Sequence, residues 1–255
     1  MKKIILLFAF LTAVASCKNT EKKEPEKQLT AGEIIDKSIA VSGGGSFAKT
    51  RISFDFRGVT YISEGNSWRN HMERIKTDSV NTTRDVLHNG DFTRYVNEKL
   101  TKVADSMTSR YANSINSVHY FAYLPYGLNS KAVNAALLDE ATVKEKDYYK
   151  IKVTFDQEGG GDDFEDVYLY WIDKTSFTMD YLAYEFHVNG GGMRFREAYN
   201  IRTVGGIRFA DYNNFKPSDE ATTLYDLDSL FGEDKLELLS KIELENISAT
   251  PCDTC

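Results

Sequence analysis

Residues 52–57 read Ile-Ser-Phe-Asp-Phe-Arg and alternate apolar with polar side chains. A period of two places every apolar side chain on the same face, which is the pattern of a β-strand with one buried face. Similar runs recur through most of the chain, separated by turn-forming residues. Short strands spaced about 8–12 residues apart are typical of an all-β sheet or barrel. Because consecutive strands usually pair with each other, antiparallel pairing is expected.

The remaining strands follow from the same alternation. The turn signal at Asn89-Gly90 is the strongest, because Asn-Gly between alternating runs favours a two-residue hairpin. In chain order, the expected strands are 68–77, 85–88, 92–96, 148–155, 166–172, 177–188, 193–203, 207–215 and 241–248.

Two helical regions interrupt this pattern. Thr30 followed by Glu33 forms a capping-box signature, and apolar residues then recur at helical spacing until Gly43-Gly44-Gly45. A second region, 103–140, is predicted to contain a helix over 104–115, an aromatic run over 118–126 and a short helix over 130–138. The sequence therefore predicts an N-terminal helix and a helical insert in the middle of the sheet.

The first 16 residues have the organisation of an export signal. Lys2 and Lys3 precede an apolar run that is too short to span a bilayer, and small residues follow. The segment ends in Val14-Ala15-Ser16-Cys17, which resembles the lipobox of bacterial lipoproteins. That resemblance implies cleavage before Cys17 and lipidation of its thiol. Two or three acyl chains would hold the protein stably on a membrane.

Charge and composition limit the partners. The net charge is −7 and becomes −9 once Lys2 and Lys3 are removed with the signal. An acidic chain lacks the basic surface that binds nucleic acid, so none is expected as a partner. Residues 18–28 are charged and contain no apolar side chain, which predicts a disordered tether.

Three cysteines are present, at positions 17, 252 and 255. An oxidising compartment favours a disulfide between Cys252 and Cys255. The alternatives for this pair are idle thiols or half of a metal site, since two thiolates leave a tetrahedral site half filled.

Several runs resemble an uncharacterised family of bacterial lipoproteins with a LolA/LolB-like lipoprotein-carrier fold. The runs are 148–155, Tyr170-Trp171-Ile172-Asp173, 179–184, Arg194-Phe195-Arg196-Glu197 and Gly206-Ile207-Arg208-Phe209. The resemblance implies a mainly β fold in which a curved antiparallel sheet, an incomplete barrel, wraps the N-terminal helix and the mid-chain insert around an apolar cavity. Proteins of this kind carry or sense acylated lipoproteins, and relatives bind other lipids.

The expected organisation has four parts. Residues 1–16 form the signal peptide, 17–29 the lipid anchor and tether, 30–248 a single LolA-like half-barrel domain and 249–255 a tail with the C-x-x-C motif. Lys18 rather than Asp follows Cys17, which resembles lipoproteins that leave the inner membrane. The envelope of a Gram-negative bacterium, at the outer membrane, is therefore the expected location.

Candidate ligand-binding residues gather in the aromatic run and on the strands. They are Phe54, Phe56, His119, Tyr120, Phe121, Tyr123, Tyr181, Arg194 and Arg196. The aromatic run would form the mouth of an apolar pocket or fill the concave face as core. Arg194 and Arg196 share a strand face, so two guanidinium groups could hold an anionic head group or pair with acidic residues across the strands.

Metal and catalytic signals are weaker. Glu185, His187 and His119 could form a zinc set, and Asp162, Asp163, Glu165 and Asp166 a calcium loop, but neither has a matching ligand spacing. No cofactor, metal or catalytic residue is therefore assigned.

Three functions remain open. The leading hypothesis is a non-enzymatic, membrane-anchored protein that binds a lipid or another apolar or amphipathic ligand. The alternative is a ligand-free interaction or envelope-sensing module, and the third is a hydrolase or metal enzyme that uses His119.

Overall fold

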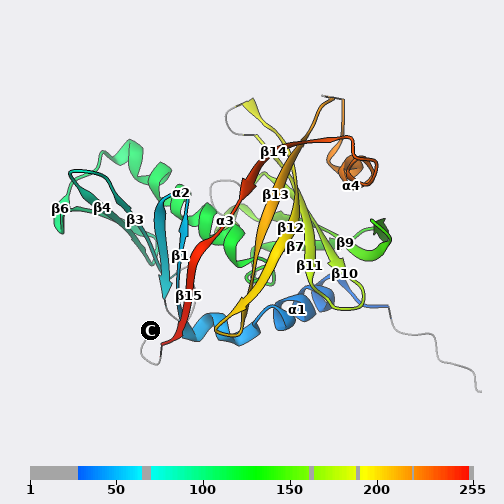
Figure 1. Cartoon of the computed structure of the whole chain (residues 1–255), viewed down its shortest axis with the longest axis horizontal. Helices are drawn as coiled ribbons and strands as arrows, with labels where there is room; N and C mark the ends of the chain where they lie inside the picture. The colour runs from blue at the N-terminus through cyan, green and yellow to red at the C-terminus, as the bar shows by residue number, and fades with distance from the viewer. Residues whose placement is uncertain (1–27, 65–69, 161–163, 188–189, 220, 253–255) are drawn as a thin grey trace, which may run out of the picture.

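The computed structural model describes residues 28–64, 70–160, 164–187, 190–219 and 221–252. The predicted signal peptide, Cys17 and most of the tether lie outside these ranges. The described chain forms two antiparallel sheets with helices between and around them (Figure 1).

The first sheet contains both ends of the fold. Its spatial order is β15 (Glu245–Pro251), β1 (Thr50–Phe56), β2 (Val59–Glu64), β3 (His71–Thr77), β4 (Thr82–His88), β5 (Asp91–Val96) and β6 (Lys99–Thr101). Strand β15 thus pairs with β1, although about 190 residues separate them in sequence. Residues Arg57 and Gly58, which have φ of 52° and 71°, form the two-residue turn between β1 and β2.

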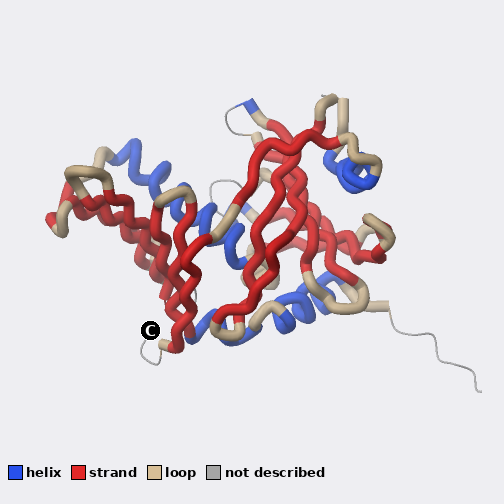
Figure 2. The backbone as a smooth tube through the Cα atoms, viewed as in Figure 1, coloured by secondary structure: helices blue, strands red, loops and turns tan. Residues whose placement is uncertain are grey.

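The second sheet holds the middle of the chain. Its spatial order is β14 (Leu236–Ile242), β13 (Ile207–Pro217), β12 (Gly192–Val204), β11 (Met179–Phe186), β10 (Val167–Asp173), β9 (Lys146–Phe155) and β7 (Val133–Leu137), and β8 (Ala141–Val143) also pairs with β9. Two residues, Glu243 and Leu244, connect β14 to β15, so the chain passes directly from this sheet into the first one. The two sheets form an open, curved arrangement and not a closed barrel (Figure 2).

Helix α1 (Ala31–Val41) begins at the predicted capping box. The Thr30 hydroxyl accepts from the backbone N–H of Glu33, and the Glu33 carboxylate accepts from the backbone N–H of Thr30. The helix is followed by Gly43, at φ 127°, where a Cβ would lie 3.1 Å from the carbonyl oxygen of Gly206. Glycine therefore lets the end of α1 approach the β12–β13 hairpin.

Helix α2 (Asp105–Tyr123) lies between the two sheets (Figure 1) and contacts β2 to β5 and β13. Small helical segments complete the fold: η1 (Gly44–Lys49), α3 (Gln157–Gly160), η3 (Leu224–Asp226) and α4 (Leu227–Gly232).

The core has two parts on opposite faces of the second sheet. The larger cluster, between the sheets, includes Ile34 and Ile35 of α1, Phe54 of β1 and Tyr170 of β10. The smaller cluster lies under α4 and includes Trp171, Phe195 and Phe231. Because neighbouring residues of a strand point to opposite faces, β10 contributes to both clusters and is buried along nearly its whole length.

The predicted mainly β, antiparallel fold with helices is confirmed, and several boundaries are corrected. Residues 130–138, predicted as a helix, contain strand β7, which pairs with β9 and packs against α1. The helix expected to end at Ile115 continues to Tyr123. The expected last strand is two strands, one in each sheet.

Candidate functional site

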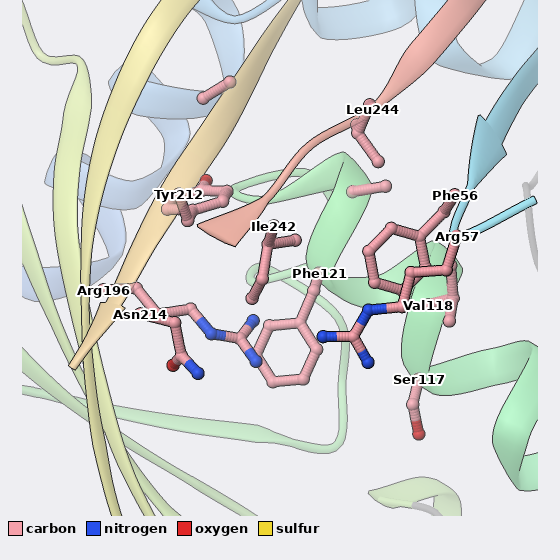
Figure 3. A pocket seen from close by; sticks show the side chains of 12 residues that line it. Phe56, Arg57, Ser117, Val118, Phe121, Arg196, Tyr212, Asn214, Ile242 and Leu244 are labelled. Atoms are coloured by element: carbon pink, nitrogen blue, oxygen red, sulfur yellow. The ribbon is translucent and has the colours of Figure 1, made fainter. Parts of the chain in front are cut away.

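A cavity of about 260 Å³ lies between the two sheets, against one side of α2 (Figure 3). It reaches the surface at Arg57, whose side chain is exposed. Most of its lining is apolar or aromatic. The lining residues are Phe56, Arg57, Ser117, Val118, Phe121, Ala122, Arg196, Ala210, Tyr212, Asn214, Ile242 and Leu244.

The spacing of the lining residues along the sequence explains two walls of the cavity. One face of α2 forms the first wall, because helical residues spaced one, three and four apart share a face; it contains Ser117, Val118, Phe121 and Ala122. Residues 210, 212 and 214 alternate along β13 and face the same side. The end of β1 and the passage from β14 to β15 close the remaining sides (Figure 3).

Arg196, on β12, is the central polar group of this cavity. Only 7% of the residue is exposed. Its guanidinium carbon lies 4.0 Å from the centre of the Phe121 ring and 5.1 Å from that of Tyr184, and Nη2 donates to the Tyr184 hydroxyl at 2.8 Å. Its Nε is buried without a hydrogen-bond partner. The aromatic rings thus hold the guanidinium plane, while one of its donors stays unused.

Asn214 lies directly opposite Arg196 on the neighbouring strand β13. Its Nδ2 donates to the Ser240 hydroxyl at 3.1 Å, and its Oδ1 is buried without a partner. Two cross-strand neighbours that line one cavity therefore each keep an unpartnered buried polar atom. Such atoms are uncommon in folded proteins, and each is a reason to look for a missing partner.

The electrostatic character of the cavity is positive. Arg57 and Arg196 line it, and no Asp or Glu is among its lining residues in the described chain. In the view of Figure 3 the two guanidinium groups reach toward Phe121 from opposite sides. Burial raises the pKa of Tyr212, while the charges of Arg208 and Arg196 oppose that shift.

Three of the residues predicted to bind a ligand line the cavity, namely Phe56, Phe121 and Arg196. The others do not. Arg194 shares the face of Arg196, as predicted, but its guanidinium lies 5.0 Å from the Phe186 ring and donates to the carbonyl of Met193. Tyr181 packs in the smaller core cluster with Phe195, on the opposite face of the sheet.

Of the two roles predicted for the aromatic run, His119 has the core role and does not lie at the mouth of a pocket. His119 is fully buried, with Nδ1 2.9 Å from the carbonyl oxygen of Ile115 and Nε2 3.1 Å from that of Ile62. Burial lowers the pKa of His119 to about 4, more than the hydrogen bonds to these two carbonyls raise it. The neutral ring has a single N–H and can donate to only one of these two carbonyls, and it packs between α2 and the first sheet.

Phe54, Tyr120 and Tyr123 are also core residues. Phe54 stacks on Tyr61 and contacts His119 edge-on. Tyr123 Oη lies 2.7 Å from the Ser63 hydroxyl, and Tyr120 Oη lies 2.6 Å from Tyr170 Oη. The aromatic run is helical, so it divides between the core and the cavity rather than facing one side.

Sequence reasoning missed most of the cavity lining. The alternation along the expected strand 207–215 indicated that Ala210, Tyr212 and Asn214 share a face. It did not indicate whether that face lines a cavity. Ile242 and Leu244 were inside the expected last strand. Nothing in the sequence indicated that Arg57 or Ala122 would line a cavity.

Several of the remaining predicted sites lie partly or wholly outside the described residues. Cys252 is disulfide-bonded, whereas Cys255, Cys17, Asp162 and Asp163 lie outside the described residues. In the described part of the chain, no three His, Cys, Asp or Glu side chains gather closely enough to hold a metal ion, so His119, Glu185 and His187 form no such set. None of the described helices has the length and apolarity needed to cross a membrane.

The chain belongs to a family of unknown function, DUF6503, whose model matches residues 2–244. This agrees with the predicted membership of an uncharacterised family. No curated protein sequence matches the chain.

Several solved structures are similar in fold. A LolA superfamily protein from Nitrosomonas europaea has 10% identity and a TM-score of 0.48 over 89% of this chain and 96% of that one. A DUF1329 family protein from Desulfovibrio piger has 10% identity and a TM-score of 0.49 over 88% and 93%. A putative outer membrane lipoprotein-sorting protein domain from Vibrio parahaemolyticus has 9% identity and a TM-score of 0.41 over 80% and 98%.

Proposed function

For a member of a family whose function is unknown, the cavity is the starting point, and we propose that this protein binds an apolar or amphipathic ligand between its two sheets. The observation that carries the proposal is the mainly apolar cavity that reaches the surface beside α2. Removing apolar ligand surface from water supplies about 25 cal/mol per Å², so side chains such as Phe121 and Ile242 would provide most of the affinity.

We also propose that the protein works from a membrane. The lipobox-like Val14-Ala15-Ser16-Cys17 supports lipidation of Cys17, and the charged residues 18–28 would separate the anchor from the fold. Labelling cells with a radioactive fatty acid would test the anchor. Label is expected in the native chain and absent from Cys17→Ala, and label retained in that variant would contradict lipidation at this cysteine.

The binding experiment uses residues 18–255, which include every described residue, purified without detergent. Native mass spectrometry and organic extraction would detect bound material, and titration with the neutral fluorescent probe N-phenyl-1-naphthylamine would measure the cavity itself. Saturable binding of the probe at a 1:1 ratio is expected. A chain that neither carries extractable material nor binds the probe would favour the interaction or sensing module.

A matched pair of variants locates the binding. Ala122→Trp places an indole in the cavity and is expected to weaken probe binding at least tenfold. Ala136→Trp makes the same change on β7, where the side chain is exposed, and is expected to bind as the native chain does. Equal affinity of all three proteins would place the probe elsewhere and contradict the proposal.

A further inference from the structure

We infer that the ligand of this cavity carries an anionic head group, a carboxylate or a phosphate, that Arg196 binds. This inference rests on the proposed function, because it names the chemical class of the ligand that the cavity would hold. It is carried by the position of Arg196, which is more than nine-tenths buried, is among the residues that line the cavity and has an Nε without a hydrogen-bond partner.

Most other arginines of the two sheets pair with a carboxylate, and Arg194, which does not, is less buried than Arg196. Arg74 and Arg94 both bind Asp85, Arg202 binds Asp211, Arg208 lies 3.5 Å from Asp180, and Arg84 lies 2.9 Å from Glu98. Arg196 has no carboxylate of the described residues within ion-pair distance, although it is more buried than Arg84 or Arg202. A buried charge without a counter-ion is costly, so an anion supplied by a ligand would stabilise this arrangement.

The geometry of Arg196 suits capture of an oxygen anion. Phe121 and Tyr184 lie against the guanidinium, and the bond from Nη2 to the Tyr184 hydroxyl fixes one edge of the group. The planar group is therefore held in place before any ligand arrives. A guanidinium held in this way binds the oxygens of a carboxylate or phosphate with little further loss of conformational entropy.

Two neighbouring features support a polar head group at this position. Asn214, opposite Arg196, keeps a buried Oδ1 without a partner; because an amide oxygen only accepts, it would pair with a hydroxyl of the head group and not with its anionic oxygens. Arg57 adds another positive charge at the exposed end of the cavity. The chain as a whole has a net charge of −7, yet the lining of this cavity contains two arginines and no acidic residue.

The apolar remainder of the lining indicates that the anion is attached to a hydrocarbon chain. Phe56, Val118, Ile242 and Leu244 surround space that a free inorganic anion would leave unfilled. A lipid-like anion would bury its tail against these side chains and place its head group at Arg196. The same guanidinium chemistry serves a fatty acid and an alkyl phosphate, so the test compares both.

The test is displacement of N-phenyl-1-naphthylamine from residues 18–255 by three ligands of equal tail length, decanoic acid, decyl phosphate and decanol. Decanoic acid or decyl phosphate is expected to displace the probe at a concentration at least tenfold below that of decanol. Whichever of the two anionic ligands binds more tightly indicates whether the head group is a carboxylate or a phosphate. Equal displacement by decanol would overturn the inference while leaving the proposed function standing. Failure of the probe and of all three ligands to bind would overturn the proposed function itself.

Variants then assign the effect to Arg196. Arg196→Met is expected to remove the advantage of the anionic ligands over decanol, and Arg196→Lys to retain part of it. Arg194→Met removes an arginine from the same strand face outside the cavity and is expected to keep the full difference. If Arg196→Met still binds the anionic ligands more tightly than decanol by the native ratio, the inference is overturned. If that variant fails to fold, the same ratio measured in Arg196→Lys and in the native chain tests the inference.

Inorganic phosphate and acetate complete the experiment as anions without a tail. Neither is expected to displace the probe at millimolar concentration, because neither contacts the apolar lining. Displacement by either one alone would assign a small-anion site and overturn the inference that the anion belongs to a lipid-like molecule.

Discussion

At the scale of single residues, His119 makes stability depend on pH. Its pKa in the folded protein is about 4, compared with about 6.5 for an unperturbed histidine, because burial disfavours the charged ring. Between pH 6.5 and 4 the unfolded chain therefore binds a proton that the folded chain does not. The contribution of this residue is fully present above pH 6.5 and is lost as the pH falls toward 4, by up to about 3 kcal/mol.

Urea unfolding of the native chain and of His119→Gln at pH 7 and pH 4.5 would test this. The free energy of unfolding of the native chain is expected to fall more between the two pH values than that of His119→Gln. His187→Gln, at an exposed position, serves as the control and should follow the native chain. If His119→Gln loses as much stability on acidification as the native chain, the buried histidine is not the source of the effect.

At the scale of elements, the β12–β13 hairpin joins the two sheets. Gly205, at its turn, has φ of 57°, and a Cβ there would lie 2.6 Å from the carbonyl oxygen of Ala249 on β15. Real Cβ atoms do not approach a backbone oxygen so closely, so Gly205→Ala would have to move β15 or the hairpin. Gly58, in the β1–β2 turn, has a similar φ of 71° but nothing within 4 Å of the same position.

The two glycines form a matched pair for a stability measurement. Gly58→Ala should cost about 1 kcal/mol, the strain of an alanine in the left-handed region. Gly205→Ala combines that strain with the backbone clash and should lower the free energy of unfolding by at least 1 kcal/mol more than Gly58→Ala does. Equal losses in chemical denaturation would show that the hairpin and β15 separate without cost.

The same scale shows what the sequence could and could not predict. Local signals were sufficient for α1, because the Thr30–Glu33 capping box is read within one turn, and for the turn at Asn89-Gly90, where φ is positive at both residues. The strand β7 was taken for a helix because its pairing with β9 and its contact with α1 are not local. Pairing of β15 with β1 could not be predicted from local signals either, since the two strands are about 190 residues apart in sequence.

The candidate site was harder to predict because it depends on register. The ladder between β12 and β13 shifts by one residue between Tyr199 and Arg202, where Asn200 has φ of 48°. Counting back from the Gly205-Gly206 turn without that bulge would place Arg196 opposite Phe215, whereas it lies opposite Asn214. A shift of one residue changes which side chains share a face. Arg196 itself was identifiable from the sequence, but its cross-strand partner was not.

At the scale of the whole molecule, the two sheets should unfold as one unit. Both contribute to the larger core cluster, α2 contacts both, and β14 continues directly into β15. Loss of one sheet would therefore expose the inner face of the other. Hydrogen exchange should give the same opening free energy for the slowest amides of β2 and of β11.

A destabilised variant makes this measurement sharper. In Gly205→Ala the protection of β2 and β11 should decrease by equal amounts, although Gly205 belongs to only one sheet. If the first sheet opens at a clearly lower free energy than the second, the two sheets are separate cooperative units and the cavity can open without global unfolding.

The pairing of β15 with β1 also sets an order of events during synthesis. A ribosome makes β1 long before β15, so the first sheet waits with one edge unpaired while the rest of the chain is made. Ile242 and Leu244, two walls of the cavity, emerge at the same late stage. A nascent or exported chain that stops before these residues would expose apolar surface without enclosing a ligand. If the protein binds a ligand as proposed, binding would require a chain that has been made as far as β15, because only then are all walls of the cavity present.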